Sequence, residues 1–182
     1  LTGTLQWSRR SDGWRVGLPD FTWRAAGTQG RGSVSLDLPG EAGQSPVLDL
    51  SANFGADDVL RLKPFIPKVW HDNLDQWLTR SILGGSVSNG DLAIHGPLAD
   101  FPFHQNPSGS WKLDFDVNDV KLVYHPDWPE IDGIHARLSF AGNGLGIRAD
   151  SGSTEGAHVD KASARIADFH DALLQADASV SG

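Results

Sequence analysis

Apolar and polar residues alternate with a period of two through most of this 182-residue chain, which limits it to a mainly β fold. The segment WKLDFDV at 111–117 shows the pattern most clearly, because its apolar residues alternate with Lys112, Asp114 and Asp116. Turns that contain glycine or proline separate further segments with the same alternation, at 33–38, 47–54, 134–140, 145–149 and 162–166. We therefore expect roughly ten or more antiparallel strands, each with one apolar face and one solvated face.

One stretch, at about 57–83, has helical spacing instead. Its apolar residues recur every three or four positions and form one stripe, made of Val69, Trp70, Leu74, Trp77, Leu78 and Ile82. Asp57 or Asp58 is a suitable N-cap for a short first turn, and the two prolines of KPFIP separate this turn from the main helix. The pair Gly84–Gly85 is expected to end the helix.

These patterns predict a single β-rich unit over 1–182, with strands at 1–56, a helical insertion at 57–83 and strands at 84–182. One helix is too small to cover the apolar face of so many strands. The sheet must either close as a barrel or sandwich, or stay open towards something apolar. We expect a large curved antiparallel sheet, a groove or half-barrel. It is repeat-like, since the segments 85–101 and 152–169 share glycines and an Asp-Phe ending.

Composition removes several classes of function. The net charge of −8, with basic residues scattered along the chain, is unsuited to binding nucleic acid. The chain has no cysteine for disulfides or thiolate ligands, and no apolar run long enough to span a membrane. It has no methionine and starts within a strand pattern, so we expect an internal segment of a longer protein.

The segment YHPDWPEIDG at 124–133 concentrates polar residues that are able to bind a metal, including His125, Asp127, Glu130 and Asp132. A metal site needs side chains that converge from a rigid frame. Pro126 and the proline three residues later impose extended or turn geometry, which points neighbouring side chains apart. We interpret the segment as a corner between neighbouring strands, with its charged groups in water.

Other polar pairs also lack the context of a reactive site. His71 and Asp75 share a helix face, but no second histidine accompanies them. Asp114 and Asp116 lie on the solvated face of one strand, whereas glycosidic chemistry needs carboxylates on both sides of a cleft. No serine lies in a GxSxG motif, and no glycine-rich loop precedes a helix. We expect no enzyme, no cofactor and no metal.

Residues 62–152 resemble the AsmA-like proteins of the YhdP type found in Gram-negative bacteria. Four segments carry the resemblance: WLTRSILGG at 77–85, GPLADFPF at 96–103, FDVNDVKLVYHPDWP at 115–129 and GNGLGIRADSG at 142–152. The flanking segments match only in style, and Thr154 stands where such proteins usually have an aliphatic residue.

This resemblance implies a periplasmic protein that is anchored in the inner membrane by a segment outside this chain. It also implies a long curved β-sheet with a hydrophobic groove, along which phospholipid passes between the inner and outer membranes. A protein with this function supports the integrity of the outer membrane. Phospholipid or another acyl lipid is then the expected partner. The residues expected to face the groove are Trp111, Leu113, Phe115, Val117, Ile134, Leu138 and Phe140.

Other interpretations stay open. Each of those seven side chains also suits ordinary core packing under the helix. The segment as a whole also suits a structural spacer with a filled sandwich, or a module that binds glycans or proteins through exposed Trp7, Trp14 and Trp23. An isolated segment is also expected to dimerise along unpaired strand edges.

Overall fold

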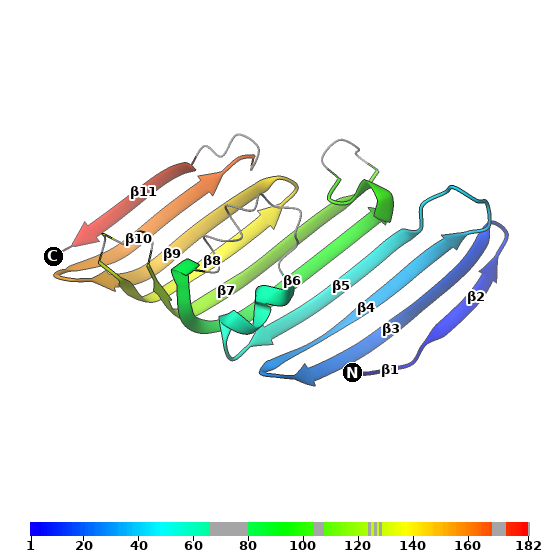
Figure 1. Cartoon of the computed structure of the whole chain (residues 1–182), viewed down its shortest axis with the longest axis horizontal. Coiled ribbons are helices and arrows are strands. Elements are labelled where there is room, and N and C mark those ends of the chain that lie inside the picture. The colour runs from blue at the N-terminus through cyan, green and yellow to red at the C-terminus, as the bar shows by residue number, and fades with distance from the viewer. Residues whose placement is uncertain are drawn as a thin grey trace.

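The computed structural model describes residues 1–65, 80–103, 108–123, 125, 127, 129–168 and 174–181. They form one antiparallel sheet of eleven strands with two short 3₁₀ helices (Figure 1). The strands are β1 (Thr2–Gly3), β2 (Gln6–Arg10), β3 (Gly13–Ala25), β4 (Thr28–Pro39), β5 (Val47–Ala56), β6 (Ile82–Pro97), β7 (Ser110–Leu122), β8 (Ile131–Ala141), β9 (Gly144–Thr154), β10 (Ala157–Ile166) and β11 (Leu174–Ser181). The 3₁₀ helices are η1 (Val59–Phe65) and η2 (Leu98–Asp100).

The sheet is open and follows the order of the chain. From β3 to β11 each strand pairs with the next one, and both β1 and β2 pair with β3 at the first edge. The two ends of the chain therefore lie at opposite edges of the sheet (Figure 1). This confirms the expected mainly β fold with a large antiparallel sheet, and the sheet does not close into a barrel.

The expected helical insertion is a minor element. Its first turn is confirmed as η1, where the side chain of Asp58 accepts a hydrogen bond from the backbone N–H of Leu60 at 2.9 Å. The apolar stripe from Val69 to Leu78 lies outside the described residues. The helical conformation ends at Ser81, so Ile82 begins β6 and does not belong to a helix. Gly84 and Gly85 lie inside this strand, because pairing with β7 extends across them.

The two similar segments at 85–101 and 152–169 fold differently, so their likeness is not a structural repeat. The first lies mostly in one long strand, β6, whose register with β7 shifts between Ser88 and Asp91. Asn89 adopts a positive φ of 51° in this bulge. The second segment contains the end of β9, a turn and then β10. The first segment therefore has a bulge within one strand at the position where the second segment has a turn between two strands.

Candidate functional site

One face of the sheet carries an apolar surface that crosses every strand from β3 to β7. Register partners on this face follow one another directly, because Leu18 lies opposite Val34, Val34 opposite Leu50 and Leu50 opposite Ile94. The row continues to Trp111 on β7. Cross-strand neighbours lie about 5 Å apart at Cβ, so their side chains contact one another. The alternation seen in separate segments of the sequence therefore becomes one continuous surface.

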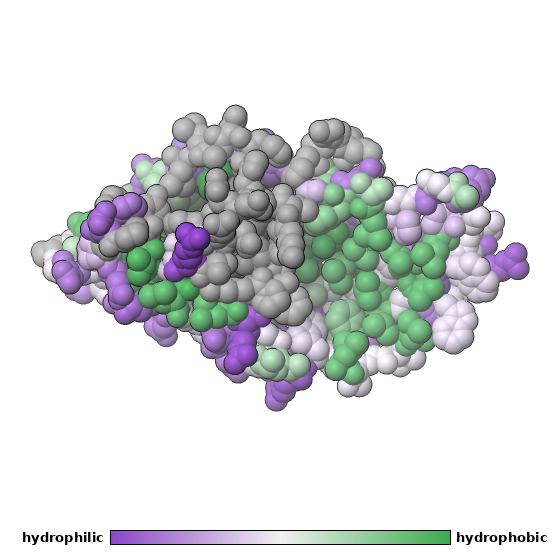
Figure 2. All heavy atoms as spheres, in the orientation of Figure 1, coloured by the Kyte–Doolittle hydropathy of each residue, from purple (hydrophilic) through white to green (hydrophobic). Residues whose placement is uncertain are grey.

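The part of this surface over β3, β4 and β5 is open. Its leucines and valines are half-buried, because they have neighbours within the sheet and no other described residues form a second layer above them. Figure 2 shows a broad apolar area over these strands and β6. We call this area the open face, and its described members include Leu18, Val34, Leu36, Leu48 and Leu50.

Two hydrophobic clusters cover the middle of the same surface. In the first, Val59 and Leu62 of η1 pack on a cluster that includes Val87 and Val117. In the second, Phe101 and Phe103 pack on the cluster of Trp111, Phe140 and Leu145. The rings of Phe101 and Phe103 meet edge to face with their centroids 5.7 Å apart. We call this part the covered face, because side chains from the connections between strands lie on it.

The seven side chains expected in the groove all lie on strands β7 and β8 of the apolar surface. Trp111, Val117 and Phe140 are buried, with only 5%, 7% and 4% of their surface exposed. The other four are half-buried: Leu113, Phe115, Ile134 and Leu138. The structure thus brings the seven together on one face, and their role as groove wall stays a prediction.

Sequence reasoning did not place the open face of β3 to β5 in the groove. Its residues show the same alternation in GSVSLDL and VLDLSANF as the seven residues on β7 and β8. The sequence pattern assigns them to an apolar face, but it does not say which part of that face is covered. The tertiary structure makes this distinction.

The opposite face of the sheet is polar and joined by ion pairs across the strands. The guanidinium of Arg15 donates two hydrogen bonds to the carboxylate of Asp37, which lowers the pKa of Asp37 and raises that of Arg15. Asp116 accepts hydrogen bonds from Asn89 at 2.7 Å and from Arg137 at 2.8 Å. These pairs make this face polar, so it suits contact with water and not contact with hydrocarbon.

Asp114 differs from the simple solvated carboxylate that the sequence suggested. Its residue is only 6% exposed, and Lys112 forms an ion pair with it at 2.6 Å. Burial by itself raises the pKa of Asp114, but hydrogen bonds from Lys112 and Ser139 outweigh burial and the net shift is downward. Asp114 is therefore a buried member of the polar network.

The segment YHPDWPEIDG connects β7 to its neighbour β8, as expected for a corner between strands. His125 and Asp127 are exposed, and Glu130 pairs with Lys121, whose pKa is raised by this hydrogen bond. Tyr124, Pro126 and Trp128 lie outside the described residues. In the part of the chain that the structure describes, no three His, Asp or Glu side chains gather as a metal site requires.

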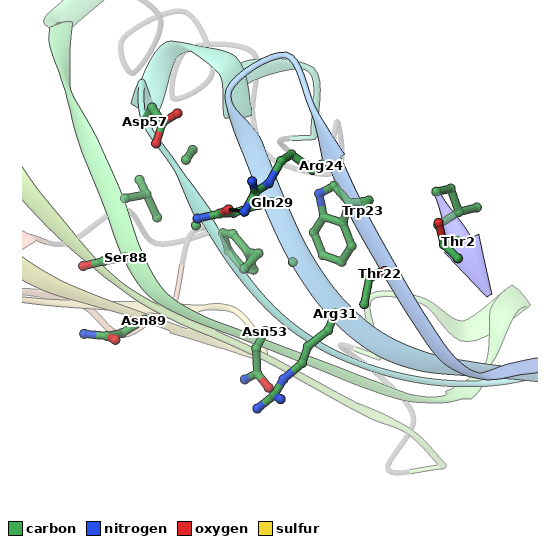
Figure 3. Close-up of a pocket in the computed structure, with 16 residues that line it drawn as sticks. Thr2, Thr22, Trp23, Arg24, Gln29, Arg31, Asn53, Asp57, Ser88 and Asn89 are labelled. Carbon is green, nitrogen blue, oxygen red and sulfur yellow. Dashed lines mark hydrogen bonds between the residues drawn. The ribbon is translucent and has the colours of Figure 1, made fainter.

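A hollow of about 800 Å³ lies at the end of β3, the start of β4 and the end of β5, where β6 passes beside them (Figure 3). Its lining includes the apolar residues Trp23, Phe54 and Val87 together with the polar residues Arg24 and Gln29. The strand registers place Trp23 and Phe54 on the apolar face, and Arg24 and Gln29 on the polar face, so the residues around the hollow belong to both faces of this end of the sheet. Sequence reasoning considered Trp23 only as an exposed aromatic residue, whereas it is half-buried.

The helices of the described residues include none that is long and apolar enough to cross a membrane.

The fold and its two faces define a class of protein: an open, one-sided antiparallel sheet that presents an uncovered apolar surface. The chain belongs to the YhdP protein family, whose model matches residues 1–182.

A curated relative gives a second comparison. The chain is 24% identical over 180 residues to a protein of Escherichia coli (strain K12) named intermembrane phospholipid transporter YhdP. The match covers 98% of this chain and 14% of the relative, so the chain spans about one seventh of that protein's length. No solved structure matches the chain.

Proposed function

We propose that this chain shelters the acyl chains of phospholipid on its apolar surface and forms one segment of a path for lipid between two membranes. The observation that carries the proposal is the open face of β3 to β5, opposite a polar face on which Arg15 and Asp37 form an ion pair. Membership of the YhdP family and the name of the E. coli relative support lipid as the ligand.

The physical basis is burial of hydrocarbon without a specific site. Removing a methylene group from water contributes about 0.8 kcal/mol, so a continuous apolar surface retains an acyl chain through many weak contacts. The headgroup stays in water at the ends of the strands. Catalytic residues are not needed for this task, and we propose a non-enzymatic function.

We propose that the groove has two walls of different kinds. The covered face includes the side chains expected from the sequence: Trp111, Leu113, Phe115, Val117, Ile134, Leu138 and Phe140. The open face over β3 to β5 offers a broad apolar area for the hydrocarbon (Figure 2). Acyl chains then lie across the open face and against the edge of the covered clusters.

We further propose that the chain is a periplasmic segment of a longer sheet, held at the inner membrane by another part of the protein. The match to 14% of the relative's length supports the idea of one segment in a longer protein. In the described sheet, β2 and β11 each have a strand on one side only, so both edges are available for pairing. An isolated segment uses the same edges to dimerise.

A matched pair of substitutions on β5 tests the proposal. Leu50 lies on the open face between Val34 and Ile94, while the next residue, Ser51, lies on the polar face between Ser33 and Ala93. Leu50→Asp places a charge among acyl chains, whereas Ser51→Asp places it in water. We expect Leu50→Asp to lower bound phospholipid about tenfold, because the buried charge lacks a partner, and Ser51→Asp to leave it unchanged.

The measurement is mass spectrometry of an organic extract of the purified 182-residue chain, with circular dichroism to verify that both variants fold. Phospholipid in the wild type that is lost only in the Leu50 variant supports the proposal. An empty wild type, or equal lipid in the two folded variants, contradicts it.

A second candidate, a module that binds glycans or proteins, rests on the exposed tryptophans near the first edge. Trp7 is 67% exposed and Trp14 is 47% exposed. Trp7 lies opposite Val16 and Trp14 opposite Leu38, so both belong to the apolar surface and also extend it towards the edge. Quenching of tryptophan fluorescence by a soluble oligosaccharide, with no bound lipid in the extract, favours this second candidate.

The filled sandwich of a structural spacer does not agree with the single open sheet.

A further inference from the structure

The apolar face carries a positive charge at the first edge of the sheet. Arg9 of β2 is the register partner of Trp14, which is in turn the register partner of Leu38 on β4. Side chains of directly paired residues project from the same face of a sheet, so Arg9 belongs to the apolar face. In the described strands β2 to β5, every other register-paired residue on this face is apolar, glycine or threonine. Arg9 is therefore an exception in a surface that otherwise excludes charge.

The next residue, Arg10, shows the ordinary arrangement of a charge in this sheet. Successive side chains of a strand point to opposite faces, so Arg10 lies on the polar face. Its Nε lies 3.9 Å from a carboxylate oxygen of Asp37, which also accepts hydrogen bonds from Arg15. Arg9, by contrast, is exposed and forms no ion pair with any described residue. Its guanidinium thus keeps its donors for an anionic acceptor from outside the described chain.

The apolar neighbours of Arg9 are large and exposed. Trp7 lies on the same face two residues before it, and Trp14 lies opposite it. These two residues are 67% and 47% exposed. The stem of an arginine side chain lies along apolar neighbours of this kind while its charged end stays in water. This corner of the sheet therefore places a cation at the border between the apolar surface and water.

We infer that Arg9 binds the phosphate group of a phospholipid whose acyl chains lie on the open face. This inference rests on the function proposed above, and it adds a fixed position for the headgroup to the retention of acyl chains. A planar guanidinium suits a phosphate because it offers parallel N–H donors to two oxygens.

The distances across the sheet agree with this arrangement. Neighbouring strands are about 4.8 Å apart, so Leu38 on β4 lies about 10 Å from Arg9 on β2. The glycerol backbone of a phospholipid, with the first methylene groups, reaches over that distance and crosses Trp14. The rest of each acyl chain then lies on Leu36 and Leu48, which are register partners on the open face.

The test compares two lipids with identical acyl chains, dioleoylphosphatidylethanolamine and dioleoylglycerol. Only the first has a phosphate, and neither has a net charge. The 182-residue chain is equilibrated with vesicles of a phosphate-free galactolipid that contain equal amounts of both, and retained lipid is quantified by mass spectrometry. We expect the wild type to retain the phospholipid about tenfold better, a factor typical of one charge-assisted hydrogen bond.

The variants use the opposite orientation of two adjacent arginines. Arg9→Gln is expected to bring the ratio of the two lipids near unity without lowering retention of dioleoylglycerol. Arg10→Gln removes the same charge from the same strand on the other face, and it is expected to keep the preference whole. Arg9→Lys is expected to keep part of the preference, since it retains the charge but not the paired donors. Millimolar inorganic phosphate is expected to leave the phospholipid in place.

Four outcomes overturn the inference. The first is equal retention of the two lipids by the wild type, which leaves the proposed function standing. The second is an equal loss of preference in Arg9→Gln and Arg10→Gln, which indicates a general effect of charge. The third is displacement of the phospholipid by free phosphate, which identifies a site for the ion alone.

The fourth outcome concerns the edge of the sheet. A charge that points inward from an edge strand also hinders pairing between edges. If Arg9→Gln forms larger species in size-exclusion chromatography while the lipid ratio is unchanged, Arg9 protects the edge and does not bind phosphate. If the wild type retains neither lipid, the proposed function fails together with the inference.

Discussion

The open face of β3 to β5 and the covered face of β6 to β8 have the same alternating sequence pattern but different surroundings. Leu36 and Leu50 on the open face are half-buried beside neighbours within the sheet. Trp111 and Phe140 on the covered face are nearly inaccessible to water, because they belong to one packed cluster against which Phe101 and Phe103 also pack. The comparison shows that alternation specifies which side of a strand is apolar, whereas connections between strands specify which part of that side is available to a ligand.

The largest expected difference between the two faces is in stability. Phe140→Ala is expected to lower the free energy of unfolding by about 3–4 kcal/mol, because it leaves a cavity in a packed cluster. Leu36→Ala is expected to cost about 1 kcal/mol, since this side chain is already in partial contact with water. Urea denaturation measures both values. Equal losses in the two variants contradict the distinction between the open and the covered face.

The second prediction concerns how contacts within the sheet stabilise the open face. Gly30→Ala is expected to cost about 1–3 kcal/mol, because the new methyl group collides with the Trp23 ring and lies 2.5 Å from the backbone oxygen of Asn53. Gly84→Ala on β6 is the control, with no atom within 4 Å of the new methyl group, and is expected to change stability by less than about 0.5 kcal/mol. Thermal unfolding compares the stability of the two variants. If Gly30→Ala and Gly84→Ala are equally stable, the position of the Trp23 indole does not require a glycine at residue 30.

The third prediction compares the polar sides of the two regions. Asp116→Ala, behind the covered face, removes the acceptor of both Asn89 and Arg137 and is expected to cost about 1–2 kcal/mol. Asp91→Ala, nearer the open face, removes a single exposed hydrogen bond from Asn53 and is expected to cost about 0.5 kcal/mol. Urea unfolding of the two variants provides the measurement. A larger loss in the Asp91 variant reverses the expected order.

The smallest expected effect is a dependence of the free energy of unfolding on pH. The pKa of Asp37 lies below the ordinary value of 3.8, because Arg15 donates hydrogen bonds to its ionised form. The stabilisation that the Arg15–Asp37 pair gives is therefore complete above the ordinary pKa of an aspartate. It is lost as the pH falls through the lowered pKa of Asp37 in the folded state. It is expected to amount to less than about 1 kcal/mol, since the pair is partly exposed. Unfolding of the wild type and of Asp37→Asn, followed from neutral to acidic pH, measures it, and parallel curves show that the pair contributes nothing.

The sequence by itself determined the class of fold and the polarity of its two faces. The period of two requires strands with one apolar side, and the turns between segments require antiparallel neighbours, so the sheet and its apolar surface were predictable. The side-chain carboxylate of Asp58 also determined the start of η1, because capping depends only on adjacent residues. These features follow from local geometry, which a single segment of sequence contains.

The tertiary structure alone decided what covers the apolar surface and where it remains open. Whether Phe101 lies on Trp111 depends on the path of a connection through space, which alternation does not encode. The same is true of the bulge at Asn89, of the buried Asp114 and of the indole of Trp23 across Gly30. Each depends on a strand that is a neighbour in the sheet and distant in the sequence. The open face, and with it the candidate lipid site, is therefore a property of how the strands and their connections come together.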